Sequence, residues 1–143
     1  MSRYLLDTNI ISNATKLEPS EKLAAWMEAQ ADEDLFISVL TVAEVQRGVL
    51  EKPAGKKRQA LQDWFSGPEG PLALFAGRVL TFDERAGLIW ARLMAEGTAK
   101  GRPGSALDMI IAAIAEANEC VVVTDNEKDF DGLKIVNPLR APS

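Results

Sequence analysis

The sequence predicts an α/β fold in which a mostly parallel sheet of about five strands is flanked by helices. Short apolar runs alternate with segments whose apolar residues recur every three or four positions, which is the spacing of one helix face. This alternation is typical of parallel sheets with right-handed connections. Because 143 residues is the length of one domain, we expect a single domain over residues 1–143, with a frayed tail from about residue 138.

Two strands and two helices are expected in the first part of the chain. Three apolar residues at 4–6 predict a short buried strand, and the Asp-Thr-Asn that follows favours a helix start, so a helix of about two turns should cover residues 9–15. Pro and Ser at positions 19–20 begin a second helix. The β-branched and aromatic residues at 35–39 predict the second strand.

A capping pattern marks the next helix. Thr41-Val-Ala-Glu44 matches a capping box, in which Thr41 would cap the helix and Glu44 would reach back to it. This helix should end at Pro53, and another should begin at the basic residues 56–58. A loop rich in Gly and Pro follows at residues 66–71.

The remaining strands alternate with two more helices. Residues 78–82 predict the third strand, and Asp83 is placed to cap a long amphipathic helix. A loop follows at 97–104. The apolar residues 120–123 predict a fully buried strand of the parallel type, and residues 134–136 predict a short last strand.

The helix that begins at Ser105 is informative about function. It is apolar on nearly all sides, which predicts that it is buried. Asp108 lies in its first turn, where Ser105 can cap the helix and the helix dipole favours a negative charge. A carboxylate on so apolar a helix is destabilising unless it is paired with another residue or a metal, and we favour a metal.

Composition removes several classes of site. The chain has no His and one Cys, which excludes His-dependent triads, the common zinc sites and an internal disulfide. Cys120 lies in an apolar run and is expected to be a small buried hydrophobic residue. Oxygen ligands remain, and these suit Mg²⁺ or Mn²⁺. Neither a membrane span nor a secretory signal is evident, so we expect a cytoplasmic protein.

Acidic and amide side chains follow several of the predicted strands. Asp7 follows the first strand, Glu44 lies shortly after the second, and Asp125 and Asn126 follow the fourth, while Asp108 joins them from its helix. Successive strand ends meet at one sheet edge, so these groups should lie together and repel one another unless a cation sits among them. Such a site suits metal-assisted phosphodiester hydrolysis. The net charge of −5 argues against a protein that coats nucleic acid.

Five segments together resemble one known family. They are residues 5–12 (Leu-Leu-Asp-Thr-Asn-Ile-Ile-Ser), 41–44, 75–83, 108–113 and 123–130. In this order they resemble PIN-domain proteins, and specifically the VapC toxins of type II toxin–antitoxin systems, closest to the FitB-like branch. The resemblance implies a three-layer α/β/α sandwich, a homodimer, and RNA cleavage that depends on Mg²⁺ or Mn²⁺. It also implies a VapB-like antitoxin that silences the toxin and binds operator DNA together with it.

The resemblance assigns roles to individual residues. Asp7, Glu44 and Asp108 match the family's acids and would be catalytic and metal-binding. The fourth position falls on Asn126, which leaves open whether Asn126, Asp125 or Asp129 completes the site. Candidate substrate contacts are Thr8, Asn9, Lys56, Lys57, Arg58 and Arg102.

Several functions remain compatible with these residues. The leading hypothesis is an endoribonuclease toxin in which Asp7 and Asp108 bind the metal and Glu44 orients or deprotonates the attacking water. One alternative is a PIN-type nuclease that matures RNA or cleaves DNA without an antitoxin. Another is a catalytically weak PIN fold that binds a basic peptide or nucleic acid. Capping alone could also explain Glu44 and Asp108, and the basic group at 56–58 could be a solvated helix face.

Overall fold

Five parallel strands form one sheet in the computed structural model, which describes residues 2–14 and 18–140. The strand order is β3-β2-β1-β4-β5, so β1 lies at the centre. The strands are β1 (Arg3–Leu6), β2 (Leu35–Ser38), β3 (Val79–Leu80), β4 (Cys120–Val123) and β5 (Ile135–Val136). The parallel sheet predicted from the sequence is therefore confirmed.

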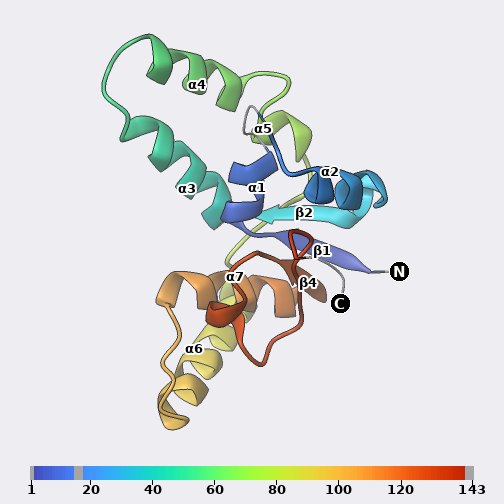
Figure 1. The fold of residues 1–143 in the computed structure, drawn as a ribbon. Helices are drawn as coiled ribbons and strands as arrows, with labels where there is room; N and C mark the ends of the chain where they lie inside the picture. The colour runs from blue at the N-terminus through green and yellow to red at the C-terminus, as the bar shows by residue number, and fades with distance from the viewer. Residues whose placement is uncertain (1, 15–17, 141–143) are drawn as a thin grey trace.

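Helices cover both faces of the sheet (Figure 1). One face carries α1 (Thr8–Ala14), α2 (Glu21–Glu28), α3 (Val39–Leu50), α4 (Lys56–Ser66) and α5 (Pro71–Leu74). The other face carries α6 (Glu84–Ala99) and α7 (Ala106–Ala117). This arrangement is the expected three-layer α/β/α sandwich. Short 3₁₀ turns precede β2 at Asp32–Asp34 and follow β4 at Glu127–Phe130.

Two apolar cores lie on the two faces of the sheet. Leu5 and Val122 belong to the core that contains α6 and α7, whereas Leu6 and Val123 belong to the core that contains α1 and α2. Side chains alternate between the faces of a strand, so consecutive apolar residues in β1 and β4 supply both cores. Each of these four side chains is at most 2% exposed. Burial on both faces explains why these strands are continuous apolar runs.

The start of α3 differs from the expected capping box. The helix begins at Val39, and its cap is Ser38, whose Oγ accepts a hydrogen bond from the Thr41 backbone N–H at 3.0 Å. Because a capping residue already ends β2, the chain enters the helix three residues earlier than predicted. Thr41 and Glu44 therefore lie inside the helix, and their assignment as a capping box was wrong. Their side chains are free for other contacts.

The predicted caps Asp83 and Ser105 are confirmed, and Ser20 caps the helix that we expected to begin there. Ser20, Asp83 and Ser105 each accept a hydrogen bond from the backbone N–H three residues later. The third strand is shorter than predicted, α6 extends to Ala99 into the expected loop, and α5 was not predicted. Residue 15, the expected end of the first helix, lies outside the described residues.

The end of the chain is held against the body as far as residue 140. Pro138 is buried, and Leu139 packs against the α1 and α2 core. Arg140 pairs with Glu127 at 2.7 Å. Residues 138–140 therefore differ from the frayed tail that we expected, while 141–143 lie outside the described residues.

Two further expectations concern burial and membranes. Cys120 is buried as predicted, and its burial raises the pKa of the thiol. Within residues 2–14 and 18–140, no helix combines the length and the apolar character needed to cross a bilayer.

Candidate active site

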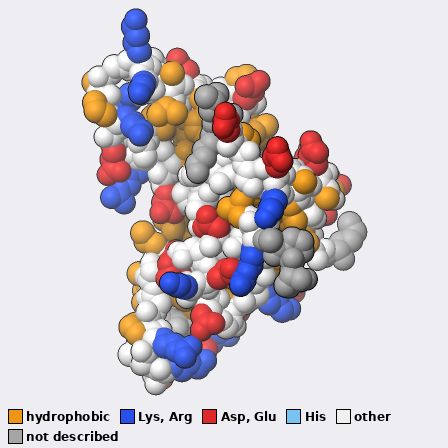
Figure 2. Space-filling model, in the orientation of Figure 1, with side chains coloured by type: hydrophobic (Ala, Val, Ile, Leu, Met, Phe, Trp, Pro, Cys, Tyr) orange, Lys and Arg blue, Asp and Glu red, His pale blue; other side chains and the backbone are white. Residues whose placement is uncertain are grey.

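An open cavity of about 480 Å³ lies at the carboxyl edge of β1 and β4. Its lining residues are Asp7, Thr8, Asn9, Ser12, Asn13, Glu44, Asp108, Asp125 and Asn126. Among the described residues that line it there are four acids and no Lys or Arg. Figure 2 shows several acidic side chains near the middle of this face, with Lys and Arg side chains at its upper left, at its lower end and also beside the acids at mid-height. The structure therefore brings Asp7, Glu44, Asp108 and Asn126 together, as the sequence predicted.

Asp7 is the most buried acid of the cavity. It directly follows β1, and its side chain is only 6% exposed. Its Oδ1 accepts a hydrogen bond from the Thr8 backbone N–H at 2.8 Å, and its Oδ2 accepts one from Thr124 Oγ1 at 2.9 Å. Burial raises the pKa of Asp7, and the negative charges of Glu44 and Asp125 add to the rise, although the two hydrogen bonds oppose it. This carboxylate is rigidly held in an environment that disfavours its unpaired negative charge.

Asp108 reaches the cavity from the first turn of α7. The Ser105 cap fixes this turn, because Ser105 Oγ accepts a hydrogen bond from the Asp108 backbone N–H. Partial burial raises the pKa of the Asp108 carboxyl to about 6, and the negative charges of Asp7 and Asp129 contribute to the rise. A nearby cation would relieve both the burial penalty and the repulsion.

Glu44 is oriented by a hydroxyl group. Thr8 Oγ1 donates a hydrogen bond to Glu44 Oε1 at 2.7 Å and also lies 3.1 Å from Thr41 Oγ1. Thr8 therefore contacts two acids, because its backbone N–H bonds to Asp7 and its hydroxyl bonds to Glu44. We predicted Thr8 as a substrate contact. It does line the cavity, but its hydroxyl proton is already given to Glu44.

The fourth corner of the site contains amides as well as acids. Asp125 and Asn126 line the cavity, whereas Asp129 is not among the lining residues and accepts a hydrogen bond from Asn126 Nδ2. Asp129 also influences the charge of Asp108. Asn9 lines the cavity as well, and its Oδ1 is buried without a hydrogen-bond partner. This corner therefore offers both carboxylate and amide oxygens to a ligand.

Thr124 is a site residue that was not expected from the sequence. It is fully buried, donates to Asp7, and accepts hydrogen bonds from the Asn126 backbone N–H at 3.0 Å and from Asn9 Nδ2 at 3.3 Å. A signal for it was present, because a hydroxyl residue directly follows the apolar run of β4. Leu6 is paired with Val123, so the next residues, Asp7 and Thr124, also lie side by side.

The predicted basic contacts lie outside the cavity. Lys56, Lys57 and Arg58 lie in the first turn of α4, at the tip of the α3–α4 hairpin (Figure 1). Arg102 follows α6 and pairs with Asp131 at 2.9 Å. It lines a neighbouring groove of about 380 Å³ that also contains Lys100, Lys128 and Asp129. None of these predicted basic residues lines the acidic cavity.

The donor set fits a hard divalent cation that keeps part of its water shell. Within the described part of the chain, no three acids converge closely enough to form a complete metal site on their own. Mg²⁺ is usually bound through one or two carboxylates and retains several waters, so full convergence is not required. The lining, which is rich in oxygen ligands, and the raised pKa values of Asp7 and Asp108 both favour such an ion.

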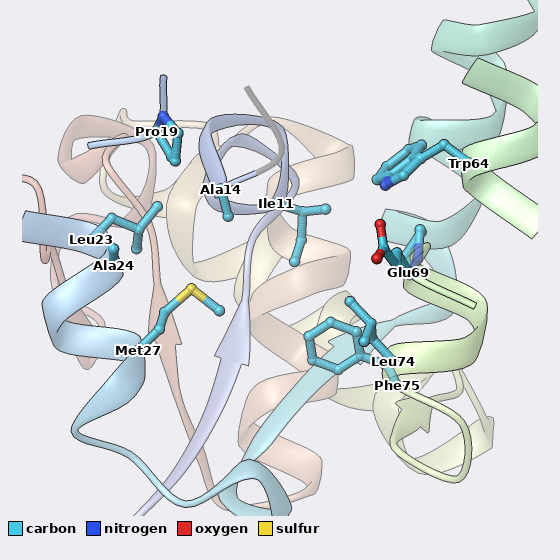
Figure 3. Close-up of a pocket in the computed structure, with 11 residues that line it drawn as sticks. Ile11, Ala14, Pro19, Leu23, Ala24, Met27, Trp64, Glu69, Leu74 and Phe75 are labelled. Atoms are coloured by element: carbon cyan, nitrogen blue, oxygen red, sulfur yellow. The ribbon is translucent and has the colours of Figure 1, made fainter. Parts of the chain in front are cut away.

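An apolar groove lies on the other side of α1. It has a volume of about 450 Å³, and its lining comes from α1, α2, α4 and α5 with their flanking residues. Figure 3 shows Leu23 and Met27 on one wall and Trp64 and Leu74 on the other, with Ile11 of α1 between them. Helix α1 thus separates this groove from the acidic cavity, which its Thr8, Asn9, Ser12 and Asn13 line.

Comparison with known proteins decides the family. The sequence model of the PIN domain matches residues 4–135. The chain belongs to the PIN-domain family.

Similar PIN-domain proteins include named toxins and ribonucleases. The VapC ribonuclease Y4jK of Sinorhizobium fredii is 41% identical over 136 residues, which is 94% of this chain and 96% of that protein. Toxin FitB of Neisseria gonorrhoeae is 36% identical over 126 residues, or 88% of this chain and 89% of that protein. A solved structure of FitAB bound to the IR36 DNA fragment superposes with a TM-score of 0.89 at 34% identity, covering 98% of each chain. The family and fold inferred from the sequence are confirmed.

Proposed function

We propose that this PIN-domain protein is an endoribonuclease toxin that hydrolyses RNA phosphodiester bonds with the help of Mg²⁺ or Mn²⁺. The observation that carries the proposal is the shared cavity of Asp7, Glu44 and Asp108, which contains no basic residue among its described lining. Similar proteins that are named VapC ribonuclease and toxin support the choice of RNA and the toxin role.

The three acids have different parts in this proposal. Asp7 is buried and held by two hydrogen bonds, so it can bind a cation without reorganisation. Asp108 would bind the same cation from α7. A bound Mg²⁺ or Mn²⁺ supplies electrostatic stabilisation of the phosphate and lowers the pKa of water. Glu44 Oε1 accepts a hydrogen bond from the Thr8 hydroxyl, which leaves Oε2 to orient the attacking water or accept its proton.

RNA must also be held by cations, because the cavity itself is acidic. We assign this part to the basic groups beside the cavity. Arg102, Lys100 and Lys128 line the groove that adjoins Asp129, and residues 56–58 stand at the hairpin tip on the other side. The phosphates of an RNA strand that crosses the cavity would contact these side chains.

An antitoxin is the proposed regulator. The apolar groove of Figure 3 is suited to apolar side chains of such a partner, and α1 is its shared wall with the acidic cavity. A partner seated there could therefore extend across α1 to the acids. The net charge of −5 disfavours DNA binding by this chain alone, so operator DNA would be bound through the antitoxin complex, as the similarity to DNA-bound FitAB suggests.

Cleavage of transfer and ribosomal RNA tests this proposal. Wild type should cleave in Mn²⁺ or Mg²⁺ and stop in EDTA. Asp7→Asn should cleave RNA at least about a hundredfold more slowly than wild type. Removing a residue that merely supports a metal ligand already lowers metal affinity or activity by about 10–100-fold. Asp63→Asn, which changes an exposed acid on α4, is the matched control and should keep wild-type activity. Equal cleavage by folded Asp7→Asn would disprove the assignment.

A further inference from the structure

Behind Glu44, three hydroxyl groups form a continuous hydrogen-bonded chain. Ser38 Oγ lies 3.3 Å from Thr41 Oγ1, Thr41 Oγ1 lies 3.1 Å from Thr8 Oγ1, and Thr8 Oγ1 lies 2.7 Å from Glu44 Oε1. Ser38 and Thr41 are both 0% exposed. Buried hydroxyls are destabilising unless they are hydrogen-bonded, so this chain satisfies groups that water cannot reach.

The hydrogen bonds between these hydroxyl groups can be donated in one direction only. An ionised carboxylate only accepts hydrogen bonds, so the single hydroxyl proton of Thr8 is given to Glu44. Thr41 must then donate to Thr8, and Ser38 must donate to Thr41. Ser38 Oγ in turn accepts from the Thr41 backbone N–H at 3.0 Å. Each hydroxyl therefore donates once and accepts once, and aligned bonds of this kind strengthen one another.

These hydrogen-bonded hydroxyl groups connect the elements that carry the acids. Ser38 ends β2, Thr41 and Glu44 belong to α3, and Thr8 begins α1. The Thr8 backbone N–H also bonds to Asp7 at the end of β1. A change in the position of Thr41 would therefore reach Glu44 through Thr8, although Thr41 itself does not line the cavity.

We propose that Ser38 and Thr41 are positioning residues, which fix the rotamer of Thr8 so that Thr8 holds the Glu44 carboxylate with Oε2 turned toward the cavity. This inference rests on the proposed role of Glu44 in RNA hydrolysis. Thr41 does not touch substrate or metal. It acts by supplying the hydrogen bond that keeps the Thr8 oxygen, rather than the Thr8 methyl group, facing residue 41.

Thr41→Val is the decisive variant. Val has nearly the shape of Thr, but it neither donates to Thr8 nor accepts from Ser38. A methyl group then faces the Thr8 oxygen, which favours rotation of Thr8 about χ1 and loss of the contact with Glu44. Thr41→Ser keeps the hydroxyl and should restore the contact. Val49→Ala, another buried substitution on α3, controls for loss of stability alone.

Kinetics separate positioning from folding. At saturating RNA and Mn²⁺, Thr41→Val should lower kcat about two- to tenfold with KM within about twofold, as expected for the loss of one hydrogen bond. Thr41→Ser should recover most of this loss. In a Glu44→Gln background, Thr41→Val should cause no further loss, because it acts through Glu44. The same fold loss in both backgrounds, or a kcat equal to that of Val49→Ala, would overturn the proposal.

A structural measurement tests the same claim without activity. The χ1 angle of Thr8, from a crystal structure or from NMR couplings, should change in Thr41→Val and be retained in Thr41→Ser. An unchanged Thr8 that still contacts Glu44 in Thr41→Val would overturn the positioning role. If wild type cleaves no RNA, the proposed function fails, and the Thr8 measurement still decides whether Thr41 positions Glu44.

Discussion

Replacing Asp108 by Asn is expected to stabilise the metal-free protein at neutral pH. Asn has nearly the same shape, and the backbone N–H of residue 108 can still bond to Ser105. The substitution removes a partly buried negative charge that is repelled by Asp7 and Asp129. A residue kept for ligand binding rather than for stability should behave in this way.

The raised pKa gives the sign and the size of the effect. The folded state binds the Asp108 proton more tightly than the unfolded chain does, because folding raises the pKa from 3.8 to about 6. The resulting stabilisation is fully present below pH 3.8 and is lost as the pH rises through 6. At pH 7 the shift corresponds to at most about 3 kcal/mol, and solvent screening of this partly exposed group reduces it to about 1 kcal/mol.

Urea or thermal unfolding in EDTA measures this difference. At pH 7, the free energy of unfolding of Asp108→Asn should exceed that of wild type by about 1 kcal/mol, which corresponds to a Tm about 3 °C higher. The advantage should shrink as the pH falls from 7 toward 4. Adding Mn²⁺ should stabilise wild type and leave the variant unchanged, since a ligand at 100 times its Kd adds about 2.7 kcal/mol. A variant that is less stable than wild type at pH 7, or that responds equally to Mn²⁺, would refute the reasoning.

Three further predictions test other parts of the account. Thr124→Val removes the donor to Asp7 and the acceptor of the Asn126 N–H, so urea unfolding should show a loss of about 1–3 kcal/mol. Leu74→Asp in the apolar groove should abolish inhibition by the antitoxin while RNA cleavage persists, whereas Leu88→Asp on exposed α6 should change neither in an inhibition assay. Arg102→Gln, in an Asp7→Asn background, should weaken RNA binding and lower its salt-dependence slope by about one in fluorescence titrations.

The acids were predictable because strand and helix patterns fix where they lie. Asp7 follows an apolar run, and the carboxyl ends of parallel strands share an edge. Asp108 could be placed through its Ser105 cap and its apolar helix. Both inferences use only local patterns and the topology of parallel sheets.

The hydroxyl contacts were not predictable in the same way. Thr41 fits a capping box as well as it fits the interior of a helix that starts at Val39, and only the end of β2 decides between them. Thr124 became visible as a partner of Asp7 only once the register of β1 and β4 was known. Register, and the side-chain directions that follow from it, depend on the packing of the whole sheet.

A single Mn²⁺ titration tests the central claim most directly. Bound metal and the rate of RNA cleavage are followed in the same samples for wild type and for Asp7→Asn. In wild type the two curves should share one midpoint, and the folded variant should lose both metal binding and cleavage. Cleavage that persists in EDTA, or a folded Asp7→Asn protein that cleaves RNA at the wild-type rate, would contradict the account.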